Sequence, residues 1–121
     1  MAYQSFEELE VWKRACRLAV DVTKALENTR NFALRDQMIR AAISVPSNIA
    51  EGNERDSWLD FIRFLRIAKG SAAELRTQCY LASKLDVLDK ATADRFVQEC
   101  REISAMLQGL IRSLAPLKTE N

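Results

Sequence analysis

Apolar side chains recur every three or four residues along one long stretch in the middle of the chain, and this spacing limits the possible folds more than any other feature. Its apolar positions are Phe61, Leu65, Ala68, Ala72, Leu75, Cys79 and Ala82. Steps of four and three place side chains on one face of an α-helix. Glycine and proline, which interrupt helices, number only 3 and 2 among 121 residues. The sequence therefore predicts an all-α protein.

Three other segments have the same spacing, so four helices are expected. The expected ranges are residues 6–27, 33–52, 57–85 and 90–114. Connections of about four or five residues place consecutive helices side by side in opposite directions. A chain of 121 residues has the length of one domain. The sequence therefore predicts a single domain, residues 1–121, folded as an antiparallel up-down-up-down four-helix bundle.

Polar residues mark the expected helix ends. Ser5 and Glu8 have the spacing of a capping box, in which two side chains satisfy backbone amides at a helix start. Ser57 and Asp89 precede the third and fourth segments as capping residues. Gly52 follows the second segment, where a left-handed residue commonly closes a helix. We therefore expect a left-handed conformation at Gly52.

The string SVPSNIAEG introduces a proline into the second segment. The residues that define this motif are Pro46, Ser47, Asn48, Glu51 and Gly52. An interior proline removes one helical hydrogen bond and bends the helix. The apolar spacing stays in register through the string, which predicts one kinked helix rather than two helices. We interpret the string as an architectural joint, and a ligand site is the alternative.

Some apolar residues lie beside the main stripes rather than within them. Trp58, Ile62 and Tyr80 fall on a flank of the third segment, and the first segment, which contains Trp12, has two apolar stripes. Contiguous apolar surface on a folded monomer usually marks an interface. These residues therefore predict self-association, with a broad core in each monomer as the alternative.

The residue types needed for most catalytic sites are scarce. The chain has no histidine, and 18 Lys and Arg against 17 Asp and Glu give a formal charge of +1. Histidine is the commonest general base and metal ligand. Cys16, Cys79 and Cys100 all lie on apolar stripes, where burial disfavours the thiolate. We therefore expect no enzymatic activity, no metal site and no cofactor.

Basic residues are concentrated on two helix faces. At 100° per residue, the basic side chains of the first segment fall within an arc of about 40° around the helix axis, and those around the third segment fall within an arc of about 80°. The face of the first segment contains Lys13, Arg17 and Lys24. The face around the third segment contains Arg55, Arg66, Lys69 and Arg76. Repeated around an oligomer, such stripes would offer phosphates a continuous basic surface. The alternative is an ordinary solvated helix face with i,i+4 ion pairs.

Three strings together resemble a known family. FEELEVWKRA, RAAISVPSNIAEGNER and FIRFLRIAKGSAAELRTQ are similar to the bacterial four-helix-bundle proteins named for intervening sequences of 23S ribosomal RNA genes, over about residues 5 to 114. The resemblance implies a ring-like homopentamer with no established enzymatic activity. Relatives include the accessory protein of diversity-generating retroelements, a pentamer that binds nucleic acid and a reverse transcriptase through a basic surface.

These observations favour a non-catalytic homo-oligomer that binds structured RNA, other nucleic acid or an RNA-protein complex through its basic helix faces. The expected partners are further copies of the chain, RNA or DNA, and a nucleic-acid-processing protein, with no membrane. We expect a cytoplasmic location because the sequence shows neither a signal peptide nor a membrane span. A protein-interaction scaffold with no nucleic-acid role is the alternative.

Overall fold

The computed structural model describes residues 4–120, and side chains through residue 117. Four α-helices account for most of this part of the chain, which contains no strand. The elements are η1 (Phe6–Glu8), α1 (Glu10–Ala25), α2 (Phe32–Asn53), α3 (Trp58–Lys84), α4 (Lys90–Leu114) and η2 (Ala115–Glu120), where η denotes a 3-10 helix. The all-α class is confirmed.

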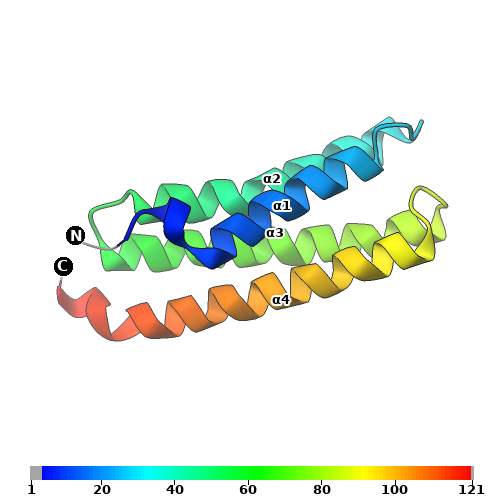
Figure 1. The fold of residues 1–121 in the computed structure, drawn as a ribbon. Helices are drawn as coiled ribbons and strands as arrows, with labels where there is room; N and C mark the ends of the chain where they lie inside the picture. Colours follow the sequence, from blue (N-terminus) through cyan, green and yellow to red (C-terminus); the bar gives the residue numbers. More distant parts are fainter. Residues whose placement is uncertain (1–3, 121) are drawn as a thin grey trace.

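The helices lie lengthwise against one another (Figure 1). The loops after α1 and after α3 lie at one end of the molecule, and the α2–α3 loop, η1 and η2 lie at the other. Hydrogen bonds link neighbouring helices at mid-length: the Ser44 and Ser71 hydroxyls are 2.8 Å apart between α2 and α3. Lys69 Nζ donates to Gln108 Oε1 between α3 and α4, also at 2.8 Å. Helix α3 is therefore hydrogen-bonded to both α2 and α4.

The core forms along the apolar stripes of all four helices. Its largest fully buried side chains are Phe61, Phe96, Leu26, Met38, Ile49, Leu65, Leu75, Ile103, Leu107, Leu114, Val22 and Val45. Each carries roughly 1.5–3 kcal/mol of favourable free energy for leaving water. The regular stripe of α3 is buried throughout, because α3 packs between α2 and α4.

Both stripes of α1 contribute side chains to the core. Val11, Ala15 and Val22 of one stripe are buried, and so are Leu9, Ala19 and Leu26 of the other. The remaining members are more open: Cys16 is half-buried, and Thr23 and Ala25 are exposed. Helix α1 contacts both α2 and α4, so it buries a broad face between those two helices.

The helix ends agree with the expected caps at Ser57 and Asp89 and differ at Ser5. Ser57 accepts from the Asp60 amide at 3.2 Å, and Asp89 accepts from the Thr92 amide at 2.8 Å. Ser5 caps η1 by accepting from the Glu7 amide, so the expected capping box with Glu8 is wrong. The first helix is consequently not continuous over 6–27, because extended backbone at Leu9 separates η1 from α1.

Gly52 was expected to adopt a left-handed conformation, and this prediction is wrong. The residue is buried inside α2, and no glycine among the described residues has a positive φ. A Cβ atom at Gly52 would lie 2.6 Å from Phe64 Cβ and 3.1 Å from Phe61 Cδ1. Glycine is therefore required because α3 approaches the α2 backbone too closely for any side chain.

Pro46 is buried within α2, which continues through it as a single helix. Two residues on, the Asn48 side-chain amide donates to the Ser44 carbonyl at 2.8 Å and to the Ser44 hydroxyl at 2.9 Å. The same hydroxyl bonds Ser71 of α3. Polar side chains near the proline thus join α2 to α3, as expected for an architectural joint. Ser47 is exposed, and Glu51 lies 4.0 Å from Arg55.

Candidate nucleic-acid interface

Lysine and arginine side chains line the groove between α3 and α4, and we call this surface the basic face. Lys69 reaches Gln108 across the groove, and Arg101 Nη2 donates to the Tyr80 hydroxyl at 3.2 Å. The face comprises Lys69 and Lys84 of α3 and Lys90 and Arg101 of α4. Arg66, three residues before Lys69, and Arg76, four before Tyr80, extend it along the same flank of α3. Two helices therefore contribute cations to one surface.

Most cations of the basic face have no anionic partner. Among the described residues, Lys90 alone of this face forms an ion pair, with Asp94 Oδ2 at 2.8 Å. Lys69 and Arg101 are hydrogen-bonded only to neutral groups, Gln108 and Tyr80, in the hydrogen bonds seen for them. Closely spaced unpaired cations create a positive potential that attracts polyanions. The basic face is therefore suited to phosphate groups.

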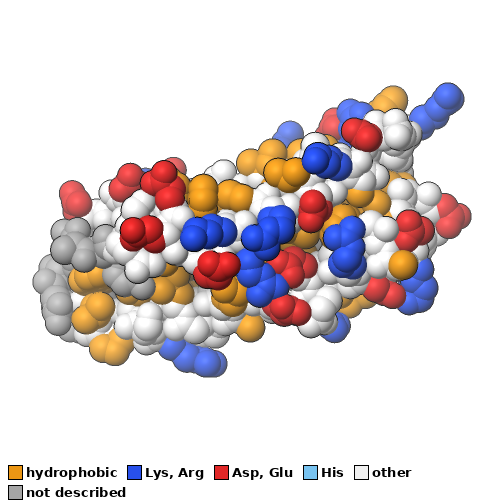
Figure 2. Space-filling model, viewed as in Figure 1, with side chains coloured by type: hydrophobic (Ala, Val, Ile, Leu, Met, Phe, Trp, Pro, Cys, Tyr) orange, Lys and Arg blue, Asp and Glu red, His pale blue; other side chains and the backbone are white. Residues whose placement is uncertain are grey.

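The charges between α1 and α4 are arranged differently. Arg14 Nε donates to Glu99 Oε2 at 2.9 Å, and Arg14 Nη2 donates to Glu99 Oε1 at 2.5 Å and Glu102 Oε1 at 2.6 Å. These hydrogen bonds raise the pKa of Arg14, and the bond from Arg14 lowers the pKa of Glu102. Figure 2 shows basic and acidic side chains interspersed over this side of the molecule. Its charges neutralise one another.

The structure does not bring the predicted basic residues into one surface. Only Arg66, Lys69 and Arg76 belong to the basic face. Lys13, Arg17 and Lys24 lie on α1, where Arg17 shares a surface hollow with Asp21 and Glu99. Arg55 lies after α2, with its guanidinium carbon 4.9 Å from the centroid of the Phe64 ring. The α1 stripe is thus mixed with acidic groups, and Arg55 covers an aromatic ring.

Sequence reasoning missed three cations of the basic face. Lys84, Lys90 and Arg101 belong to it, and each lies outside the stripes identified from spacing. Tyr80 was the available signal, because it shares a flank of α3 with Lys69 and Arg76 at 100° per residue. Which flank of α4 faces that side depends on helix packing, and the sequence alone does not specify it.

Most of the predicted interface residues pack within their own chain. Ile62 is only 3% exposed and belongs to the core, so its expected place on an outer flank is wrong. Trp12 and Trp58 are half-buried against the core, and the Trp12 ring lies edge-on to Phe6 with centroids 5.3 Å apart. Tyr80, at 46% exposure, is the predicted interface residue that lies most open to solvent.

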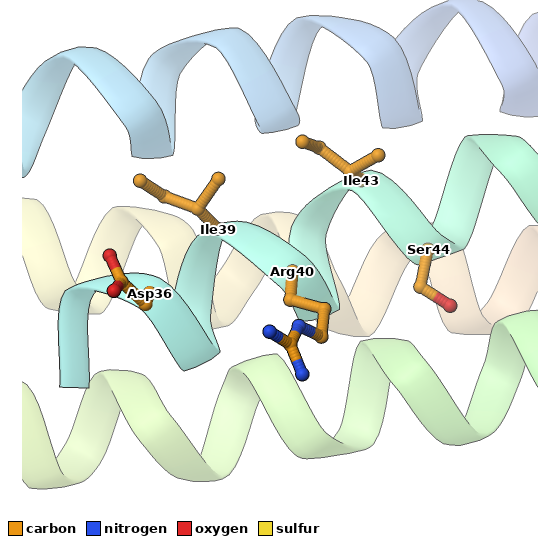
Figure 3. Close-up of a pocket in the computed structure, with 5 residues that line it drawn as sticks. All are labelled: Asp36, Ile39, Arg40, Ile43 and Ser44. Carbon is orange, nitrogen blue, oxygen red and sulfur yellow. The ribbon is translucent and has the colours of Figure 1, made fainter. Parts of the chain in front are cut away.

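Exposed apolar side chains lie on α3, at Leu59, Ile67, Tyr80 and Leu81, and also on α2. Phe32 and Ile43 are 56% and 50% exposed, and Ile39 is half-buried one turn before Ile43. Ile39 and Ile43 point toward α1 in Figure 3, whereas Arg40 points toward α3. We call Phe32, Ile39 and Ile43 the apolar face of α2. Their spacing of seven and four residues was visible in the sequence, but their exposure was not.

The described residues hold no group of three His, Cys, Asp or Glu side chains that could bind a metal ion. Burial raises the pKa of Cys79 to about 12, and it also raises the pKa of Cys16. Thiols with raised pKa values are poor nucleophiles at neutral pH. No helix in the described part of the chain is long and apolar enough to cross a membrane.

The fold and its surface define a class of protein: an all-α protein of four long helices with a cationic groove. The family model of the 23S rRNA-intervening sequence protein matches residues 7–109, and the chain belongs to this family. A similar solved structure is that of a protein of unknown function from the S23 ribosomal protein family of Bacteroides thetaiotaomicron. It is 25% identical with a TM-score of 0.79, and the match covers 84% of this chain and 97% of that chain. No curated protein matches the chain.

Proposed function

We propose that this protein is a non-catalytic homo-oligomer that binds structured RNA or other nucleic acid through its basic face. The unpaired cations of the α3–α4 groove carry this proposal. Contacts from lysine and arginine to phosphates supply affinity that depends little on base sequence. The family's connection with intervening sequences of ribosomal RNA genes makes RNA the first ligand to test.

The decisive experiment measures binding of a fluorescent RNA hairpin across a series of salt concentrations. Log K should fall linearly with log salt, because bound phosphates release counterions. The variant Arg66→Glu with Lys69→Glu removes two cations of the basic face. Its slope should be smaller by about 1.8, at about 0.9 per lost phosphate contact with a duplex. Absence of salt-sensitive binding by the assembled protein would refute the proposal.

The α1 stripe provides a matched control. Lys13→Glu with Lys24→Glu makes the same change in net charge but lies outside the basic face. We expect this variant to keep most of the slope, since its positions are mixed with acidic groups. Equal losses in both double variants would show that net charge, and not the α3–α4 groove, controls binding.

The proposed assembly uses the apolar face of α2, and a pentameric ring of up-down-up-down bundles is the form we propose. Asp36 and Arg40 flank Ile39 and Ile43, so the same surface offers both charges beside apolar groups (Figure 3). A surface with both signs can complement another copy of itself. Light scattering should report about five subunits, and Ile43→Glu should lower that number. An unchanged mass for Ile43→Glu would exclude this face.

The exposed apolar face also favours a second function, a scaffold that binds another protein and no nucleic acid. A partner that stays bound after nuclease treatment would support this alternative. Material that is lost with nuclease would instead support nucleic-acid binding. Both proposals place the protein in the cytoplasm.

A further inference from the structure

A small hollow opens beside Tyr80, where the basic face reaches the end of α3. It has a volume of about 180 Å³ and lies between α3 and α4. Tyr80, Cys79, Ala93 and Val97 line it, together with Ser83. Lys84, Lys90 and Asp94 also line it, and Asp94 pairs with Lys90 at 2.8 Å. A recess with an aromatic ring, apolar groups and two cations, one of them paired, is therefore present within the surface proposed to bind phosphates.

Tyr80 is held in place yet remains open to solvent. Its hydroxyl accepts a hydrogen bond from Arg101 Nη2 at 3.2 Å, and the residue is 46% exposed. Tyr80 is also the exposed aromatic residue of the basic face, since Phe32 lies on α2 near the α1–α2 loop. A fixed aromatic ring with an accessible surface is the usual platform for an unpaired base.

We propose that this hollow receives an unpaired nucleobase, which stacks on Tyr80 while its flanking phosphates contact Lys84, Lys90 and Arg101. The proposal rests on nucleic-acid binding by the basic face and adds the kind of nucleic acid that binds best. Bases paired within a duplex are stacked on their neighbours and do not reach a side-chain ring. The favoured ligand is therefore a structured RNA with a bulge, a loop or a single-stranded end.

The test compares two RNA hairpins that differ only in a three-nucleotide bulge in the stem. The full-length protein should bind the bulged hairpin about tenfold more tightly, given the typical contribution of one stacked base. Tyr80→Ala should abolish this preference, so that the variant binds the two hairpins equally well. Tyr80→Phe should retain the preference, because the ring remains.

Phe32→Ala is the matched control, because it removes an exposed aromatic ring outside the basic face. It should leave the preference intact. A second measurement uses unaltered protein: 4-thiouridine in the bulge, activated by light, should crosslink to the tryptic peptide of residues 77–84. This readout does not depend on how well the Tyr80 variants fold.

Equal affinity for the two hairpins, or a crosslink outside residues 77–84, would overturn the stacking proposal while leaving the basic face in place. A Tyr80→Ala variant that keeps the full preference would do the same. Failure to bind either hairpin at low salt would overturn both proposals. The salt slope and the bulge preference thus separate the two ideas.

Discussion

Two grooves run along α4, and they differ in whether their charged side chains are paired within the chain. In the groove against α1, the Arg14 guanidinium bonds both Glu99 and Glu102, and Arg95 lies 4.0 Å from Asp21. In the groove against α3, the cations of the basic face have one anionic partner among the described residues, Asp94. The first groove joins two helices, whereas the second presents charge to solvent.

The difference separates charges that stabilise the fold from charges available to a ligand. Arg14 is mostly shielded, with its side chain 24% exposed, and its bonds are satisfied within the chain. Arg66 and Lys84 are exposed and have no such partners among the described residues. Mutual repulsion of unpaired cations destabilises a folded chain slightly. An arrangement of this kind is expected where an anionic ligand offsets the repulsion.

The largest expected effect is a difference in stability between two charge-reversal variants, one in each groove. Arg14→Glu places three carboxylates together and should lower the free energy of unfolding by about 3 kcal/mol, since it removes charge-assisted hydrogen bonds and adds repulsion. Lys84→Glu makes the same change in net charge in the α3–α4 groove and should change stability by less than about 0.5 kcal/mol. Urea unfolding of both variants measures the contrast.

Nucleic-acid binding should respond in the reverse order. Lys84→Glu should weaken binding of an RNA hairpin, whereas folded Arg14→Glu should bind nearly as well as the unaltered protein. Equal stability losses in the two variants would contradict the division into a structural groove and a binding groove.

A smaller effect on stability is expected from the loop that joins α3 to α4. Asp86 has a φ of 58°, and the Val87 amide bonds the Ala82 carbonyl at 2.8 Å, so the loop ends α3 with a left-handed residue. Asp86→Gly should relieve the left-handed strain and stabilise the protein by roughly 0.5–1 kcal/mol. Thermal unfolding measures this gain. A loss of stability would mean that the Asp86 carboxylate contributes more than its backbone strain costs.

Acid should weaken the α1–α4 groove in particular. The bond from Arg14 lowers the pKa of Glu102 from its ordinary value of 4.5. A lowered folded-state pKa contributes stability that is present above about 4.5 and is lost as the pH falls through the folded-state value. The midpoint of urea unfolding should therefore fall between pH 6 and pH 3, and it should fall less in Arg14→Met.

Arg14→Met leaves the capping carboxylate of Asp89 in place, whose pKa is also lowered, chiefly by the backbone hydrogen bond from Thr92. The difference between the two pH profiles thus reports on the α1–α4 groove alone. Identical profiles would show that Glu102 gains nothing from Arg14.

The smallest effect is expected from Asp94, the anion paired with Lys90. Asp94→Asn frees Lys90 and should tighten binding of an RNA hairpin by about twofold, while stability changes by less than about 0.5 kcal/mol because the pair is exposed. Fluorescence anisotropy at a fixed salt concentration measures the change. Weaker binding would indicate that the Asp94 carboxylate itself contacts the ligand.

Much of the architecture was predictable because it depends on local patterns. The 90–114 range matches α4, and Ser57 and Asp89 cap the helices that follow them. The predictions were wrong where the same local sequence pattern is compatible with two different structures. Ser5 caps a short 3-10 helix instead of a long α-helix, and Gly52 permits close helix contact instead of a left-handed turn. Neighbouring elements decided both outcomes.

The sequence by itself determined the all-α class, the positions of α2, α3 and α4 and the α3 stripe that becomes core, because helix periodicity and capping act over a few residues. Only the tertiary structure decided which members of the two α1 stripes are buried, that Ile62 is internal, and that Lys90 and Arg101 join Lys69 on one face. A helix has several flanks of similar composition, and the rotation of each helix against its neighbours selects which flank faces solvent.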